Sequence, residues 1–347
     1  MKLTEEQKSI IRNILKLDKK IYKIGGYAGT GKSTLIQHLI YALPNFAVCA
    51  FTGKAASVLR KKEINDARTI HSLIYKAHKD EKNNVYFTLE SSIDCDGIIV
   101  DEASMVSEEI YKDLICFNKP VIFVGDHGQL EPVGDNTFNL MRDPDYRLEK
   151  IHRNSGEIAH FAEFIRNGYR PSSWQHKASS SQKIKFLSKN AYEEVSLEVD
   201  QIICAFNKTR CEINSSVRLK MGKNTPGPQV GDRIICLRNN KPLGLYNGMQ
   251  GFIGWFHNKN FIQFVCDEFS NDINIDLNSF NTIKYEFDFS KESPNPFDYA
   301  YAITCHKCQG DEFDKVLVVE QKCDLWSHPR WAYTAASRAK KQLFWCY

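Results

Sequence analysis

A glycine-rich segment near the N-terminus combines the residue types that bind phosphate. The pattern G-x-x-x-x-G-K-[ST] is matched at every required position by Gly26-Tyr27-Ala28-Gly29-Thr30-Gly31-Lys32-Ser33. Its glycines let backbone N–H groups close around phosphates, and a helix beginning there adds its positive end. The Lys32 ammonium can reach β- and γ-phosphates, and the Ser33 hydroxyl can bind Mg²⁺. The segment therefore predicts a nucleoside triphosphate site.

A second chemical signal is a pair of carboxylates at the end of an apolar run. Asp101 and Glu102 directly follow Gly97-Ile98-Ile99-Val100. After a phosphate-binding loop, such a pair suits Mg²⁺ binding by Asp101, with Glu102 orienting or deprotonating the attacking water. An Asp-Glu pair after a strand is also common as a helix N-cap, and the upstream loop favours the catalytic interpretation.

The elements that must position these residues alternate between strand and helix. Helical spacing of apolar residues is found at 5–17, 32–41 and around 54–59, and buried strands are predicted at 21–24, 47–51, 97–100 and 120–124. This order is typical of a parallel sheet with covered faces, which binds ligands at the carboxyl ends of its strands. The pattern restarts after Arg147 with strands at 201–206 and 316–319. Residues 229–297 instead carry short β-rich runs and tight turns, which predict a small antiparallel barrel.

Composition limits the class of protein without naming it. The 347 residues are 42% hydrophobic and 25% charged, which predicts a soluble chain of two or more domains. Neither a membrane-spanning segment nor a secretion signal is recognisable, so we expect a cytoplasmic protein. A net charge of +4 does not by itself indicate a nucleic-acid binder.

The eleven cysteines are scattered singly, which favours reduced thiols over a disulfide framework. Cys305-x-x-Cys308, with Cys323 and His328 downstream, raises zinc as an alternative. The spacing is loose for a zinc site, so zinc is disfavoured.

Motifs along nearly the whole chain resemble superfamily 1 helicases, and among them the RecD/Dda-like B branch. In chain order, the segments that carry the resemblance are 3–7, 26–34 (motif I), 51–56 (Ia), 69–72, 100–105 (II), 125–130 (III), 148–153 (IV), 302–313 (V) and 333–339 (VI). The resemblance implies two RecA-like P-loop NTPase domains with a hairpin (pin) insertion and an SH3-like β-barrel insertion. The domains would be 1–74 with 92–147 (1A), 75–91 (1B, the pin), 148–228 with 298–347 (2A) and 229–297 (2B).

The resemblance also implies residue roles for ATP hydrolysis. The catalytic set would be Lys32, Asp101, Glu102, Gln129, Arg153 and Arg338, the two arginines acting as arginine fingers from the second domain. Gln7 would recognise adenine. The ATP contacts would be Gln7, Gly26, Ala28, Gly29, Thr30, Gly31, Lys32, Ser33, Thr34 and Glu312, with Mg²⁺ on Ser33 and Asp101.

Further residues fall at the family's DNA-facing positions. The nucleic-acid set would be Thr52, Lys54, Thr69, His71, Tyr86, Phe87, Thr304 and His306. For His71 and His306 the alternative is a structural role in their loops. Tyr86 or Phe87 would stack on the last base pair of a duplex, and the alternative is an apolar hairpin face packed on the core.

The sequence therefore predicts ATP- and Mg²⁺-dependent translocation on single-stranded DNA with duplex unwinding. The 5′→3′ direction follows from resemblance to the B branch alone. We expect a monomer that binds single strands and single-strand/duplex junctions, together with replication or recombination proteins. Three alternatives remain: a translocase that barely unwinds, a P-loop small-molecule kinase, and a DNA-binding scaffold that uses ATP as a switch.

Overall fold

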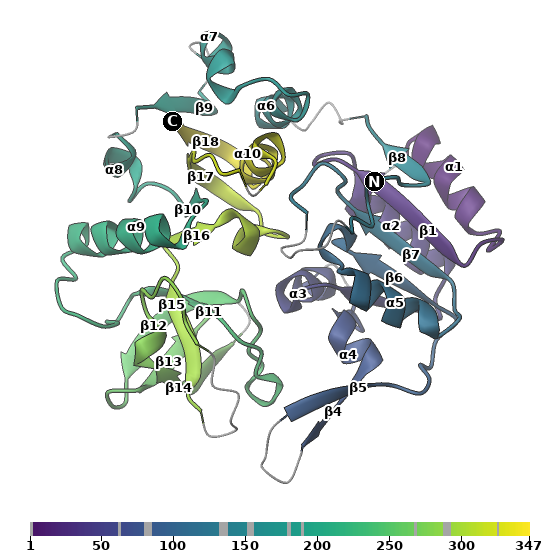
Figure 1. The fold of residues 1–347 in the computed structure, drawn as a ribbon, viewed down its shortest axis with the longest axis horizontal. Coiled ribbons are helices and arrows are strands. Elements are labelled where there is room, and N and C mark those ends of the chain that lie inside the picture. Colours follow the sequence, from purple (N-terminus) through teal and green to yellow (C-terminus); the bar gives the residue numbers. More distant parts are fainter. Residues whose placement is uncertain are drawn as a thin grey trace. The chain divides into compact units, whose positions relative to one another are not determined.

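The computed structural model divides the chain into two compact units (Figure 1). Unit 1 is Met1–His78 with Tyr86–His160, and unit 2 is Lys79–Val85 with Phe161–Tyr347. The residues that the structure describes are 3–61, 64–79, 85–131, 138–150, 156–178, 182–188, 191–266, 269–286, 293–324 and 326–347. Within these ranges no helix is long and apolar enough to cross a membrane.

Unit 1 is built on a six-stranded parallel sheet. Its order is β3 (Arg68–Thr69), β2 (Phe46–Ala50), β6 (Gly97–Asp101), β7 (Val121–Gly125), β1 (Ile21–Gly26) and β8 (Tyr146–Leu148). The four predicted strands are confirmed to within one or two residues. The short edge strands β3 and β8 were not predicted. Every pairing in the sheet is parallel, as the alternation of strands and helices indicated.

Both faces of this sheet are covered because successive strand residues point to opposite sides. Ile99 and Ile122 pack with α1 (Glu5–Ile14) and α2 (Lys32–Ala42). Val100 and Phe123 pack on the other face with α4 (Ile70–Ile74) and α5 (Glu108–Cys116). Further helical elements among the described residues of unit 1 include α3 (Gly53–Lys61) and the 3₁₀ helix η1 (Ala103–Met105). Apolar burial on two sides explains why the strands read as continuous hydrophobic runs.

A two-stranded hairpin follows α4 and consists of β4 (Tyr75–Lys79) and β5 (Val85–Leu89). His78 Nε2 lies 2.7 Å from Thr88 Oγ1 across the two strands. The Phe87 side chain is 57% exposed. Its ring is therefore not part of a packed core, which was one of the two interpretations of this segment.

Unit 2 contains a second parallel sheet of five strands. Its order is β16 (Ala302–Thr304), β10 (Gln201–Cys204), β17 (Phe313–Val319), β18 (Ala339–Cys346) and β9 (Ile184–Leu187). The helical elements described from residue 156 onward are α6 (Gly156–Arg166), which begins in unit 1 and ends in unit 2, η3 (Pro171–Trp174), α7 (Gln175–Ala178), α8 (Tyr192–Val195), α9 (Asn207–Lys220), η4 (Lys241–Leu243), η5 (Leu277–Ser279), η6 (Cys305–Cys308) and α10 (His328–Ala336). The mixed α/β architecture with two such sheets is as predicted.

A closed five-stranded barrel interrupts the second sheet in sequence. Its strands are β11 (Arg233–Cys236), β12 (Gln250–Phe256), β13 (Phe261–Val265), β14 (Ser270–Asp276) and β15 (Asn295–Tyr299). Buried residues such as Ile262, Phe264 and Phe297 fill its interior. A Cβ on Gly251 would lie 2.6 Å from Phe264 Cε2, so only glycine permits the close approach of β12 to β13.

One pairing of the barrel differs from the all-antiparallel prediction. β14 and β15 run parallel, with Ile275 opposite Asn295. The connection across residues 277–294 is long enough to return the chain in the same direction, which a parallel pair requires. The domain boundaries that the sequence suggested stay predictions.

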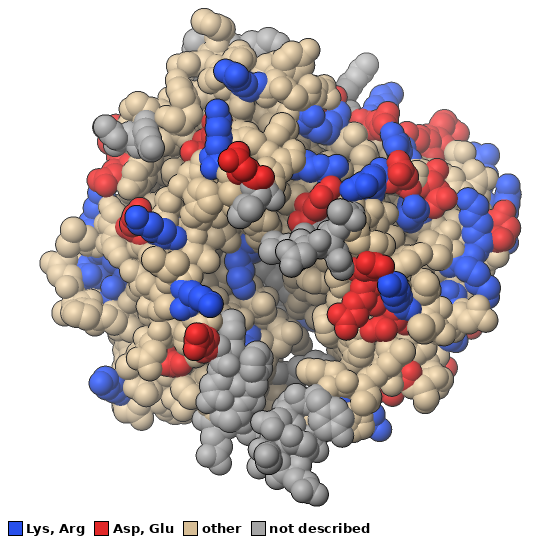
Figure 2. Space-filling view, viewed as in Figure 1, with Lys and Arg blue, Asp and Glu red and all other residues tan. Residues whose placement is uncertain are grey.

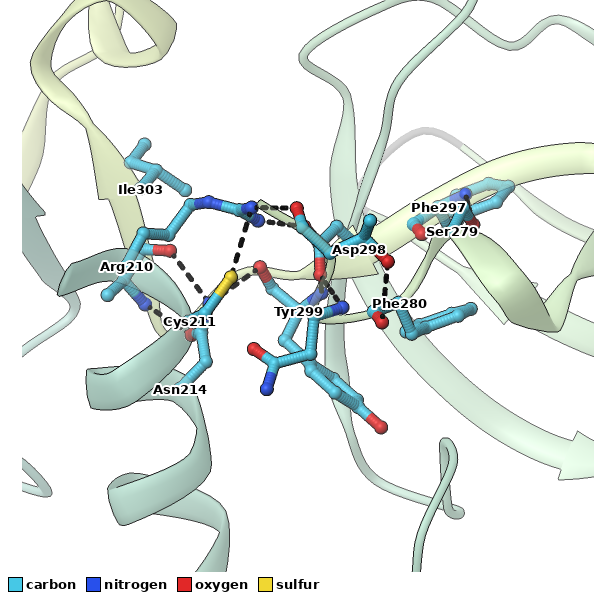
Figure 3. Close-up of polar contacts among 12 residues, drawn as sticks. Arg210, Cys211, Asn214, Ser279, Phe280, Phe297, Asp298, Tyr299 and Ile303 are labelled. Atoms are coloured by element: carbon cyan, nitrogen blue, oxygen red, sulfur yellow. Dashed lines mark hydrogen bonds and ion pairs between the residues drawn. The ribbon is translucent and has the colours of Figure 1, made fainter. Parts of the chain in front are cut away.

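Helix α9 joins the second sheet to the barrel through buried polar side chains (Figure 3). Arg210, Asn214 and Arg218 recur every four residues and so share one helix face. Arg210 forms an ion pair with Asp298 of β15. Asn214 Nδ2 donates to the backbone oxygens of Tyr299 (3.3 Å) and Ala302 (3.2 Å).

The third member of this face reaches the start of the barrel. Arg218 Nε donates to Asp232 Oδ1 at 3.2 Å, and its guanidinium lies 4.3 Å from the Tyr299 ring centroid. Both carboxylates, those of Asp232 and Asp298, are buried. The α9–barrel junction is therefore held by two buried ion pairs with an amide between them.

Removing one partner of a buried ion pair should strongly destabilise unit 2. Asp298→Ala leaves the Arg210 guanidinium buried without its counter-charge, and also removes the acceptor for the N–H groups of Asn281 and Tyr299. We expect a loss of about 3–5 kcal/mol in the free energy of unfolding. All five tryptophans lie between residues 174 and 345, so tryptophan fluorescence in urea reports on unit 2.

Asp314→Ala is the matched control. Asp314 pairs with Lys340 and Lys341 at the surface, where solvent screens the interaction. Its urea midpoint should equal that of the unchanged protein, and an equal loss in both variants would contradict the assigned importance of the buried pair.

Candidate functional site

The carboxyl ends of three neighbouring strands bring the predicted motifs of unit 1 together. Strands β6, β7 and β1 are adjacent and parallel, so their carboxyl ends lie at one edge of the sheet. β1 runs into the glycine-rich loop, β6 ends at Asp101, and β7 leads to Asp126. This edge is where ligands bind in open α/β sheets.

The glycine-rich loop has the backbone form that a phosphate cradle needs. Gly29 and Gly31 have φ angles of 79° and 84°, which side chains disfavour, and Gly31 is the N-cap of α2. Lys32 Nζ donates to the carbonyl oxygens of Gly26 (2.7 Å) and Tyr27 (3.1 Å). The ammonium group is therefore held over the loop, at the N-terminus of the helix, where an anion binds favourably.

Asp126 is a member of the site that sequence reasoning missed. Its carboxylate is buried and lies 3.9 Å from Lys32 Nζ. It also accepts hydrogen bonds from Gly128 N (2.9 Å) and from Gln129 Nε2 (3.2 Å). Asp126 thus connects the lysine of motif I to the glutamine of motif III. The sequence could have identified Asp126, because this residue follows a buried strand as Asp101 does.

The carboxylate pair at the end of β6 lies at a sharp turn. Asp101 Oδ1 accepts a hydrogen bond from Glu102 N at 2.9 Å. Glu102 has φ 53° and ψ 40°, a left-handed conformation that costs a residue other than glycine about 1–3 kcal/mol and is found most often at functional sites. Glu102 directly precedes η1, but its side chain accepts no capping hydrogen bond from that helix. A capping role for the Glu102 carboxylate, the alternative to the catalytic role, is therefore not supported.

Magnesium fits the donors at this edge. Ser33 follows Lys32 in the first turn of α2, and Asp101 ends the strand beside β7. Mg²⁺ is commonly bound by one or two protein oxygens together with substrate phosphates and water. Among the described residues no three His, Cys, Asp or Glu side chains form a metal-binding group.

Gln7 is fixed between the start of α1 and the phosphate loop. Its Oε1 accepts from Thr4 N at 3.0 Å, and its Nε2 donates to Gly31 O at 3.2 Å. The side chain is 2% exposed. An amide group has a second N–H and a second lone pair, so these contacts leave hydrogen-bonding capacity for a base.

The predicted DNA-facing residues of unit 1 lie in different local environments. Thr52 Oγ1 accepts from Ala55 N at 3.1 Å, and Thr69 caps α4 by accepting from Ser72 N at 3.2 Å. The His71 side chain is exposed. The side chains of Lys54 and Tyr86 lie outside the described residues. Basic and acidic groups are interspersed on the face shown in Figure 2, so a uniform basic surface is not what this face offers.

Motif V begins with β16 in unit 2 and continues through η6. Thr304 is 9% exposed and precedes η6. The His306 ring lies 5.4 Å from that of Trp326, and burial lowers the pKa of the His306 imidazole. Burial therefore favours the neutral form of this imidazole. Lys307 Nζ donates to Asn247 Oδ1 at 2.7 Å, which ties this motif to a turn of the barrel.

The two cysteines of this motif are structural. Cys308 Sγ donates to Cys305 O at 3.0 Å, and Cys305 Sγ lies 3.6 Å from Trp331 O. Burial raises the pKa of the Cys305 thiol. Zinc at this motif stays a disfavoured alternative.

Arg338 of motif VI is held within unit 2. Its guanidinium donates to Thr334 O (3.0 Å), Asp311 O (3.1 Å) and Ser337 Oγ (2.9 Å), and the residue is 5% exposed. These bonds join motif VI to the end of motif V, a role that the sequence did not suggest. The neighbouring Glu312 is exposed. Arg153 lies outside the described residues.

Comparisons with known proteins agree with this arrangement. The AAA domain family matches residues 2–187, and the UvrD-like helicase C-terminal domain matches residues 299–345. The ATP-dependent DNA helicase dda of Enterobacteria phage T4 is 32% identical in an alignment of 188 residues, which covers 48% of this chain and 43% of that protein. RecBCD enzyme subunit RecD of Buchnera aphidicola (subsp. Schizaphis graminum) is 33% identical in an alignment of 148 residues, which covers 35% of this chain and 24% of that protein. The chain therefore spans less than half the length of these curated relatives.

Solved structures show the fold. A structure of two coordinating Pif1 helicases at forked double-stranded DNA has a TM-score of 0.69 at 23% identity, covering 99% of this chain and 92% of that chain. Pif1 helicase from Bacteroides with ADP-AlF3 and single-stranded DNA gives 0.66 at 22%, with the same coverage. The dda and RecD similarities support a likeness to the RecD/Dda-like superfamily 1B helicases. Because the first family matches more than half of the 347 residues, the chain belongs to the AAA domain family.

Proposed function

We propose that this protein hydrolyses ATP to move 5′→3′ along single-stranded DNA and to unwind duplex DNA at single-strand/duplex junctions. The observation that carries the proposal is the second parallel sheet, with motifs V and VI at its strand ends. A P-loop kinase needs one such core and a lid, so it leaves this sheet unexplained. The DNA-bound Pif1 structures of the same fold support the choice of substrate.

The hydrolytic step uses residues of unit 1. Lys32 and the N–H groups of the loop hold the phosphates, and Glu102 orients or deprotonates the attacking water. Mg²⁺, held by Ser33 and Asp101, neutralises phosphate charge when bound. Gln129 senses the γ-phosphate in this proposal, and its hydrogen bond to Asp126, which lies near Lys32, supports that role. Arg338, and Arg153 as the second arginine finger, supply positive charge to the phosphoryl group during turnover.

The DNA strand is held mainly by hydroxyls and imidazoles. Thr52, Thr69 and His71 serve in unit 1, with Thr304 and His306 in unit 2. Phosphate contacts of this kind position a strand without reading its sequence, which suits a motor that moves along DNA. We propose a monomer that acts with replication or recombination proteins.

Strand displacement on three duplexes tests the function and its direction. With ATP and Mg²⁺, a 5′-tailed duplex should be unwound, whereas 3′-tailed and blunt duplexes should not. Unwinding of only the 3′-tailed duplex would keep the motor and overturn the direction. DNA-stimulated ATP hydrolysis without unwinding would indicate a translocase, and hydrolysis without DNA stimulation would favour the kinase. DNA binding without sustained turnover would indicate the ATP-switched scaffold.

Lys32→Ala should abolish this activity, because it removes the ammonium group at the phosphates. We expect DNA-stimulated kcat to fall by about 10²-fold or more. Lys112→Ala is the matched control, since Lys112 pairs with Glu108 on the exposed face of α5. Retained hydrolysis in Lys32→Ala would contradict the proposed site.

Gln7→Ala tests recognition of the base. Loss of its amide hydrogen bonds should raise KM for ATP by about 2- to 10-fold. KM for GTP should change less, because Gln7 is proposed to recognise adenine. Parallel ATP and GTP titrations measure the difference, and an equal rise for both nucleotides would show that Gln7 only stabilises the loop.

Phe87→Ala separates unwinding from translocation. If the exposed ring stacks on the last base pair, its loss should slow strand displacement about five-fold or more. ATP hydrolysis stimulated by single-stranded DNA should stay within about two-fold of the unchanged protein, since the ring is far in sequence from the phosphate loop. An unchanged rate of strand displacement would show that the Phe87 ring does not stack on the last base pair.

A further inference from the structure

Two aromatic rings connect the phosphate loop to motif III. The rings of Tyr27 and His127 have their centroids 4.1 Å apart and are tilted by 38°. Tyr27 occupies an unspecified position of the pattern G-x-x-x-x-G-K-[ST], and His127 directly follows the buried Asp126. Centroids 4.5–7 Å apart are typical of aromatic pairs, so this contact is close.

The register of the sheet places the two rings opposite each other. Gly25 of β1 pairs with Gly125 of β7, and each ring lies two residues beyond its glycine. Gly25 also provides the space that the imidazole occupies. A Cβ at that position would lie 2.7 Å from His127 Nδ1.

The ring contact runs beside the polar connection of the same two loops. The Tyr27 carbonyl accepts hydrogen bonds from Lys32 Nζ (3.1 Å) and Thr30 Oγ1 (2.8 Å), so this residue forms part of the cradle. His127 directly follows Asp126, whose carboxylate lies 3.9 Å from Lys32 Nζ. The Tyr27 backbone therefore contacts the lysine ammonium directly, while its ring contacts the residue that follows Asp126.

We propose that Tyr27 and His127 are positioning residues, whose ring contact holds the phosphate loop in its nucleotide-binding form. A loop that is ordered before binding loses less conformational freedom when phosphate arrives, which strengthens the complex. The proposal rests on the nucleotide site of the proposed function and is independent of movement along DNA.

Calorimetric titration of the chain with ADP and Mg²⁺, without DNA, tests whether the contact between the Tyr27 and His127 rings strengthens nucleotide binding. Tyr27→Ala and His127→Ala should each raise the Kd for ADP about five-fold. The double variant should be no weaker than either single variant, because the rings act as a pair. Tyr27→Phe and His127→Phe keep a ring and should restore the Kd to within about two-fold of the original.

Controls separate a positioning role from a general loss of structure. Tyr41→Ala removes the same side chain from a position that is 89% exposed on α2, and its Kd should not change. The thermal unfolding midpoint of every variant shows that the chain is folded. Unchanged affinity in the alanine variants, additive effects in the double variant, or failure of the phenylalanine variants would each overturn the proposal.

The outcome is distinguishable from failure of the proposed function. If the unchanged protein binds ADP, the ring variants bind ADP more weakly, and DNA does not stimulate ATP hydrolysis, the positioning role is confirmed and the proposed movement along DNA is contradicted. If the unchanged protein does not bind ADP, both are overturned.

Discussion

The buried Asp126 carboxylate is the interaction on which the nucleotide site depends. A charge removed from water is tolerated only where hydrogen bonds and opposite charge surround it. Lys32, Gly128 and Gln129 provide that environment, and each belongs to a loop that must be in place for the site to form. The order of strands β6, β7 and β1 makes this possible, because it brings three strand ends to one edge.

Buried polar groups have a comparable part in unit 2. Arg210, Asn214 and Arg218 are buried on one face of α9, where an apolar face would pack equally well. An apolar contact tolerates sliding, whereas ion pairs and amide hydrogen bonds require one arrangement. We infer that this face fixes how the barrel is attached to the second sheet.

The strands that carry motifs I, II and III could be predicted because each is a buried apolar run that ends in a polar motif. Strands β3 and β8 have two and three residues, too few to show a pattern. The α9 face was unpredictable for a different reason. Arginine and asparagine at four-residue spacing normally indicate a solvated surface. This face of α9 can be buried because the carboxylates of Asp232 and Asp298, which belong to other elements, pair with the two arginines. Arg338 was predicted from its motif, but its bonds to Thr334 and Asp311 depend on local geometry that no spacing rule specifies.

The barrel is attached to the rest of unit 2 at more than one place. Arg210 and Arg218 hold β15 and the approach to β11, and Lys307 of motif V holds the turn at Asn247. A body fixed at separated points cannot swivel about any one of them. If the second sheet rotates by a small angle, the barrel must rotate with it. The displacement of barrel residues is then largest for those farthest from the points of attachment.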